Sequence, residues 1–139
     1  MTHRPPRVLI IDNDDGLTLA LRVRLESEGY ECVTACTGSQ GLSLFAESDF
    51  DAVITDLNMP AGDGIAVCES IRSTCRVPLI IVTGFESSYT DLLDRLGDIE
   101  LIQKPFCIDS LLDELDIAIE MNTAGSDHAP PEPKRREAA

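Results

Sequence analysis

Four polar residues each stand at the end of a short apolar run: Asp12, Asp56, Thr83 and Lys104. Asp56 follows the run FDAVIT and precedes LNMPAGDG, so an apolar segment leads into a carboxylate and then into a turn rich in Pro and Gly. In open α/β sheets, ligands bind beyond the carboxyl ends of the strands. The recurrence of this arrangement predicts one site assembled from four strand ends.

The acidic members of this set predict a bound divalent cation. The motif IIDNDDG after the first apolar run contains Asp12, Asp14 and Asp15. Asp56 ends another run, so these carboxylates converge if the two strands are neighbours. Converging like charges are unfavourable unless a cation offsets them, and Mg²⁺ needs only one or two carboxylates. Asp14 and Asp15 also fit a second interpretation, as helix-capping and first-turn acids, whereas Asp12 lies within the strand end and has no capping role.

Thr83 and Lys104 add donors for an anionic group. Thr83 ends PLIIVT, and Lys104 follows IELIQ and precedes Pro105, which restricts the backbone that presents the ammonium group. A hydroxyl and an ammonium beside a metal-bound carboxylate stabilise a phosphoryl group. Taken singly, Thr83 also fits a β-branched strand residue and Lys104 an ordinary surface charge. Taken together, the set favours phosphoryl transfer to Asp56.

Strand-like and helix-like segments alternate along the chain. Strand-length apolar runs occur at 7–11, 31–35, 51–55, 78–82 and 99–103. Helical spacing separates them, weakly around 89–96, and a clear amphipathic helix follows the last run. Alternation predicts parallel strands with right-handed crossovers, and near-continuous apolar strands predict a sheet covered on both faces. The predicted fold is a three-layer α/β sandwich.

Composition and charge exclude several classes of protein. The 139 residues suffice for one domain, and a hydrophobic content of 43% supports a packed core. The net charge of −14 argues against direct binding to nucleic-acid phosphates or anionic lipid. No apolar run approaches the roughly 20 residues that cross a bilayer, and no signal peptide precedes the first strand. We therefore expect no membrane association and a cytoplasmic location.

The cysteines and the C-terminal segment show no clear chemical pattern. Five scattered cysteines are expected to be small buried or half-buried thiols, with zinc binding as a remote alternative: Cys32, Cys36, Cys68, Cys75 and Cys107. Residues 122–139 lack apolar periodicity and are rich in Pro and small residues, so we expect a disordered tail after a domain that spans 1–121. The tail's basic cluster, Lys134 to Arg136, is shorter than most basic binding patches, which favours a solvated tail over a docking segment.

Four motifs in order, VLIIDNDD, VITDLNMPAGDG, LIIVTG and LIQKPF, resemble the receiver domain of two-component response regulators over about residues 6–121. The resemblance implies a flavodoxin-like (βα)5 fold with parallel strand order 2-1-3-4-5. It implies a phosphoacceptor switch, not a conventional enzyme, in which Asp56 accepts a phosphoryl group from the phosphohistidine of a sensor histidine kinase or phosphotransfer protein.

The same resemblance implies roles for individual residues. Mg²⁺ would be bound by Asp56, by the backbone carbonyl of Asn58, and by Asp12 through water. Lys104 would contact a phosphoryl oxygen, and Thr83 would move toward the phosphoryl group. Signalling would pass through contact with an output protein. Receivers also often dimerise through the face formed by the fourth helix, fifth strand and fifth helix, which makes a homodimer an option here.

Two positions depart from the receiver pattern. Asn13 replaces the second of two adjacent acids, which normally touches the metal; an amide oxygen can still coordinate Mg²⁺, but with one negative charge fewer. Leu101 stands where receivers commonly carry an aromatic residue that moves with the switch threonine. These departures leave open an atypical receiver that binds partners without phosphorylation.

Two further alternatives concern the chain as a whole. The chain could be a stand-alone receiver, or a piece of a hybrid histidine kinase or of a longer regulator. Its IIDNDDG and LIIVTG motifs also resemble those of haloacid-dehalogenase-like phosphatases, which would make Asp12 the nucleophile. The later acidic pair of those enzymes is missing, which makes this the remote reading.

Overall fold

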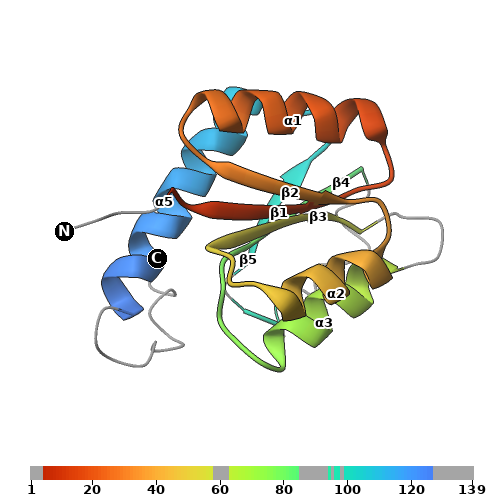
Figure 1. The fold of residues 1–139 in the computed structure, drawn as a ribbon, viewed down its shortest axis with the longest axis vertical. Helices are drawn as coiled ribbons and strands as arrows, with labels where there is room; N and C mark the ends of the chain where they lie inside the picture. Colours follow the sequence, from red (N-terminus) through yellow and green to blue (C-terminus); the bar gives the residue numbers. More distant parts are fainter. Residues whose placement is uncertain (1–4, 58–62, 85–93, 95, 98, 127–139) are drawn as a thin grey trace.

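A computed structural model describes residues 5–57, 63–84, 94, 96–97 and 99–126. Five parallel strands form one sheet in the order β2-β1-β3-β4-β5 (Figure 1). The strands are β1 (Arg7–Ile11), β2 (Glu31–Ala35), β3 (Ala52–Asp56), β4 (Leu79–Thr83) and β5 (Ile99–Gln103). The described helices are α1 (Asp15–Ser27), α2 (Gly38–Glu47), α3 (Asp63–Arg72) and α5 (Ile108–Ser126). The predicted three-layer α/β fold and its strand order are confirmed.

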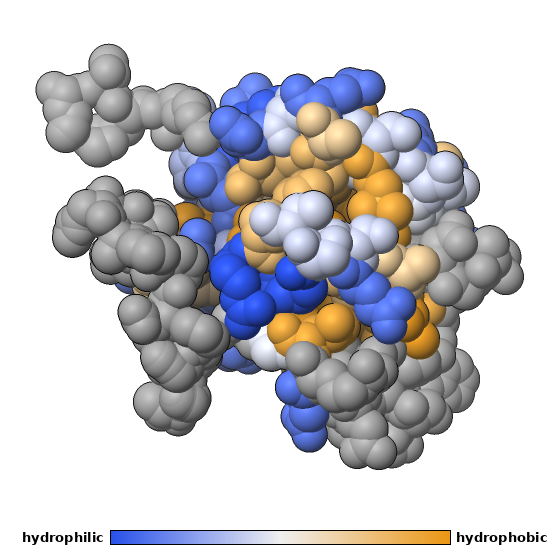
Figure 2. Space-filling model, turned by 90° about the horizontal axis from the view of Figure 1, so that it is seen from below, coloured by the Kyte–Doolittle hydropathy of each residue, from blue (hydrophilic) through white to orange (hydrophobic). Residues whose placement is uncertain are grey.

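The helices cover both faces of the sheet, with α1 and α5 on one side and α2 and α3 on the other (Figure 1). Side chains alternate along a strand, so Val8 and Ile10 pack under α1 and α5, while Leu9 and Ile11 pack under α2 and α3. This explains why the strands are near-continuous apolar runs. Seen from the side of α2 and α3, apolar residues form groups near the middle of the surface, with hydrophilic residues between and around them (Figure 2).

The strand boundaries differ from the predicted ones at two functionally important places. β3 and β4 each begin one residue later than expected and extend by one, so that Asp56 and Thr83 are the last residues of their strands. Both side chains are buried although they are polar. The helix expected around 89–96 falls almost entirely outside the described residues.

Side-chain caps set where α1 and α2 begin. The Asp14 carboxylate accepts a hydrogen bond from Leu17 N at 3.1 Å, and the Thr37 hydroxyl accepts one from Gln40 N at 3.0 Å. These bonds satisfy backbone donors that the first helical turn leaves free. The capping interpretation of Asp14 therefore agrees with the structure.

The C-terminal region differs from the expected boundary. Helix α5 continues to Ser126, so residues 122–126, which were expected to begin the tail, are helical. The remaining residues, 127–139, lie outside the described part of the chain, and the tail stays a prediction. Within the part that is described, no helix is long and apolar enough to span a membrane.

All five cysteines are free, but two of them are more exposed than expected. Cys32 and Cys68 are buried, and burial raises the pKa of their thiols to about 11 and about 12. Cys75 is half-buried, whereas Cys36 and Cys107 are exposed. The expectation of buried or half-buried thiols is therefore wrong for these last two, which lie just after β2 and just before α5.

Gly64, in the first turn of α3, lies directly against the backbone that follows β3. A Cβ at this position would come within 2.5 Å of Leu57 Cα and 3.0 Å of the Asp56 carbonyl carbon, with the Asp56 carbonyl oxygen closer still. These are backbone atoms, which cannot rotate away as the end of a side chain can. The absence of a side chain at Gly64 thus lets α3 begin beside the peptide that presents Asp56.

Replacing Gly64 by Ala should therefore lower the free energy of unfolding by about 1–3 kcal/mol, because the new methyl group forces a backbone shift in a packed region. Gly16→Ala is the matched control: a Cβ there would meet only Asp14 Oδ1 at 3.5 Å, an ordinary contact. Ala also favours a helix, so this control should be neutral or stabilising by up to about 1 kcal/mol. Urea denaturation of both variants measures the difference, and equal stabilities would contradict the close-approach argument.

Candidate functional site

Two carboxylates meet at the carboxyl edge of the sheet because β1 and β3 are neighbours. Ile11 pairs with Thr55, so the next residues along each chain, Asp12 and Asp56, come side by side. β2 lies on the outer side of β1, and β4 on the outer side of β3, which makes this the point where the strand order reverses. Such switch points are where doubly wound sheets bind ligands. Asp12 and Asp56 are only 5% and 4% exposed.

Lys104 brings a positive charge to both carboxylates. Its Nζ lies 3.2 Å from Asp56 Oδ2 and 3.4 Å from Asp12 Oδ2. The lysine side chain is 29% exposed, so the ammonium group reaches the pair from the solvent side. Three residues that are far apart in the sequence and were predicted to share a site therefore lie together.

Thr83 lies beside this cluster and is joined to it by a main-chain hydrogen bond. Asp56 pairs with Val82 of β4, and Thr83 follows as the last residue of that strand, fully buried. Its carbonyl oxygen accepts a hydrogen bond from Lys104 N at 2.8 Å. The backbones that carry the hydroxyl and the ammonium are thus directly joined. The peptide bond between Lys104 and Pro105 is cis.

Burial sets the electrostatics of the site. Desolvation raises the pKa of Asp12 above its usual value, even though a hydrogen bond from Asp14 N at 2.9 Å and the charge of Lys104 both favour the carboxylate. Burial also disfavours the charged form of Lys104, but the two carboxylates outweigh it and raise the pKa of the lysine. Lys104 therefore keeps its proton to a higher pH than a free lysine, and Asp12 gives up its proton less readily than a free aspartate.

The oxygen donors of this site fit Mg²⁺. Asp12 and Asp56 offer two buried carboxylates, and Mg²⁺ combines one or two such ligands with water. Asn13 is exposed beside them. The Asp14 side chain caps α1, which commits it to Leu17 N and leaves it poorly placed to replace the missing acid. Asn58, the remaining predicted ligand, lies outside the described residues. Among the residues that are described, no three His, Cys, Asp or Glu side chains form a metal-binding group.

One positioning residue was not found from the sequence. Gly41 lies inside α2, and a Cβ there would come within 2.7 Å of Ile11 Cγ1. The missing side chain lets α2 pack closely on the end of β1, one residue before Asp12. Glycine in a helix interior costs about 1 kcal/mol relative to alanine, so its presence was a usable signal of close packing.

The raised pKa of Asp12 has a consequence for stability. In the folded state Asp12 keeps its proton to a higher pH than in the unfolded chain, so stability falls as pH rises through the window above 3.8. Asp12→Asn removes this cost. The variant should be more stable than the natural protein at pH 7, and the difference should shrink as the pH approaches 4. Denaturant unfolding at several pH values measures it, and a less stable variant at pH 7 would show that the ion pair with Lys104 dominates instead.

Comparisons with known proteins agree with this architecture. The family model for the response regulator receiver domain matches residues 8–116. The transcriptional regulatory protein KdpE of Mycobacterium tuberculosis is 35% identical over 125 residues, which cover 86% of this chain and 54% of KdpE. The transcriptional regulatory protein GlrR of Escherichia coli is 35% identical over 130 residues, covering 91% of this chain and 29% of GlrR. The chain thus spans about half or less of the length of these relatives.

Solved structures show the same fold. A response regulator receiver domain protein from Clostridium thermocellum superposes with a TM-score of 0.79 at 28% identity, covering 86% of this chain and 98% of the other. The receiver domain of HemR from Leptospira biflexa gives 0.74 at 32% identity, covering 82% and 94%. Since the family model covers most of the chain and the strand order is that of these structures, the chain belongs to the receiver domain family of two-component response regulators.

Proposed function

We propose that Asp56 accepts a phosphoryl group from the phosphohistidine of a sensor histidine kinase or phosphotransfer protein. The observation that carries this proposal is the bridging of two buried carboxylates, Asp12 and Asp56, by the ammonium group of Lys104. An Oδ atom of Asp56 would form a bond to phosphorus while the nitrogen–phosphorus bond of the donor breaks. Mg²⁺ held by the carboxylates would neutralise charge on the transferring group.

The residues around Asp56 have complementary roles in this proposal. Lys104 offsets the carboxylates before transfer and can turn to a phosphoryl oxygen afterwards, since its Nζ already lies 3.2 Å from Asp56 Oδ2. Thr83, joined to Lys104 through the backbone, is the candidate to respond to the new group. The walls of the site are buried, which strengthens each of these electrostatic interactions.

The output of the switch would be a protein contact. The matched region covers 54% of KdpE and 29% of GlrR, both named transcriptional regulatory proteins, and a role in transcriptional regulation is for this chain a proposal. A homodimer through the face that contains β5 and α5 is one form of such a contact. The proposed location of the protein is the cytoplasm. The strongly acidic chain, with a net charge of −14, favours proteins with basic surfaces over nucleic acid as direct partners.

A second candidate function is an interaction module that acts without phosphorylation. Asn13 favours it, because this position supplies an amide in place of the second acid and the neighbouring Asp14 is engaged in capping α1. The two candidates differ in whether the site binds Mg²⁺ strongly enough for transfer.

Labelling with acetyl phosphate or beryllofluoride, with and without Mg²⁺, tests the proposed function. We expect a Mg²⁺-dependent adduct on Asp56, located by peptide mass mapping, and none in the Asp56→Asn variant. An adduct on Asp12 would instead indicate the phosphatase-like chemistry. No adduct at any Mg²⁺ concentration would favour the interaction module.

The Asn13→Asp variant should bind Mg²⁺ on the order of tenfold more tightly. A unit charge about 4 Å from the ion is worth roughly 1 kcal/mol or more, and about 1.4 kcal/mol corresponds to a factor of ten. NMR titration with Mg²⁺ measures the affinity.

The matched control for this titration is Asp14→Asn, which keeps a good helix cap and removes a charge. Its Mg²⁺ affinity should stay close to that of the natural chain. A large loss in this control would show that Asp14 compensates for Asn13, and equal affinities of the natural chain and Asn13→Asp would show that position 13 does not contact the ion.

A further inference from the structure

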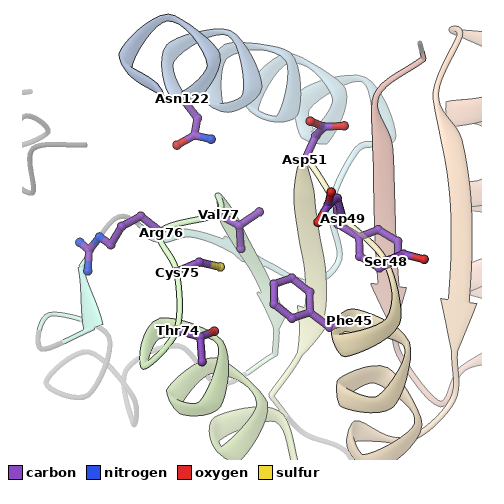
Figure 3. A pocket seen from close by; sticks show the side chains of 10 residues that line it. Phe45, Ser48, Asp49, Asp51, Thr74, Cys75, Arg76, Val77 and Asn122 are labelled. Carbon is purple, nitrogen blue, oxygen red and sulfur yellow. The ribbon is translucent and has the colours of Figure 1, made fainter. Parts of the chain in front are cut away.

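A groove of about 460 Å³ lies at the amino edge of the sheet, at the opposite end of the strands from Asp56. Its walls come from the segments that lead into β3 and β4, from the end of α2, and from α5 (Figure 3). Phe45 and Asp49 form one side, Cys75 and Val77 another, and Asn122 of α5 the third. The site described above does not use this groove.

The walls combine aromatic rings with negative charge. Phe45 and Phe50 stack with centroids 6.1 Å apart, and both line the groove. The guanidinium of Arg7 already lies 5.1 Å from the Phe50 centroid, so the Phe50 ring carries a cation within the fold, and Phe45 is the ring left for a further one. Asp49 is exposed at the same place, whereas Asp51 is half-buried and its Oδ2 accepts a hydrogen bond from Arg7 N at 2.8 Å. Arginine or lysine side chains are the groups that such walls accommodate.

Helix ends add to the negative potential. The carboxyl ends of α2 and α5 lie close to the groove, and neither helix has a basic residue in its last turn. The partial negative charge of a helix C-terminus favours cations. The end of α3 is different, because Arg72 donates to Val77 O at 2.8 Å, Cys75 O at 3.3 Å and Gly97 O at 3.1 Å.

One cation, Arg76, also lines the groove. Its guanidinium is directed away from Phe45 and Asp49 in Figure 3, so it stands at the rim.

We propose that the groove binds the basic cluster of the chain's own C-terminal segment, Lys134, Arg135 and Arg136. Helix α5 reaches Ser126 only four residues after Asn122, so the segment departs from beside the groove. Seven residues then separate Ser126 from Lys134, and the eight Cα–Cα steps between them span up to about 26–29 Å when the chain is extended. A tethered segment has an effective concentration in the millimolar range, so weak charge and cation–π contacts suffice for occupancy.

The thiol of Cys75 reports on this contact, because it is half-buried and lines the groove. The full chain is compared with a variant in which Lys134, Arg135 and Arg136 are all replaced by Ala. Both are treated with iodoacetamide, and alkylation is followed by peptide mass mapping. Cys75 should react severalfold faster in the variant, while the exposed Cys36 and Cys107 react at unchanged rates.

The matched control replaces two acidic residues of the same segment, Glu132→Ala and Glu137→Ala, and should leave Cys75 protected. The backbone amide signals of Val77 and Asn122 in NMR spectra give a second readout, and they should shift in the triple variant alone. Unchanged Cys75 rates together with unshifted amides would overturn the proposal. Protection that grows with protein concentration would also overturn it and point to the segment of a second copy. No readout depends on phosphorylation of Asp56.

Discussion

The carboxyl edge of this protein depends on one electrostatic balance, in which a single ammonium offsets two buried carboxylates. Asp12 and Asp56 are almost completely buried, and bringing such like charges together is unfavourable without a counter-ion. Lys104 lies within 3.4 Å of both. Burial, together with the charge of Asp56, raises the pKa of Asp12 despite this compensation. The negative charge of the two carboxylates is therefore only partly compensated, and this favours the binding of a divalent cation.

Main-chain contacts hold the strand ends that carry these charged side chains. Asp12 N donates to Ala35 O, and Lys104 N donates to Thr83 O, so residues of neighbouring strand ends are joined by main-chain hydrogen bonds. Gly64 allows α3 to begin directly against the peptide after Asp56. Because these contacts involve backbone in a packed core, the Asp56 carboxylate is held with little freedom before any ligand binds.

Much of this arrangement can be predicted from the sequence, because buried parallel strands are continuous apolar runs. The polar residues that end these runs are then candidates for a shared site. The ends of β3 and β4 were placed one residue short, since Asp56 and Thr83 are polar residues that the strands nonetheless bury. Strand order came from the resemblance to receivers, because apolar runs do not encode which strands are neighbours. The continuation of α5 to Ser126 was missed, since residues 122–126 carry no apolar stripe.

Asn13 changes the charge balance of the site in two opposing ways. With an acid at this position, a third carboxylate would join Asp12 and Asp56 near one lysine, and the cluster would need a cation more strongly. With the amide, Mg²⁺ would gain less on binding, but the carboxylates repel one another less before it binds. Lys104 is then the larger part of the compensation. A receiver of this kind would depend more on its lysine and less on its metal than one with two adjacent acids, so Lys104 is the residue on which its phosphoryl chemistry would rest.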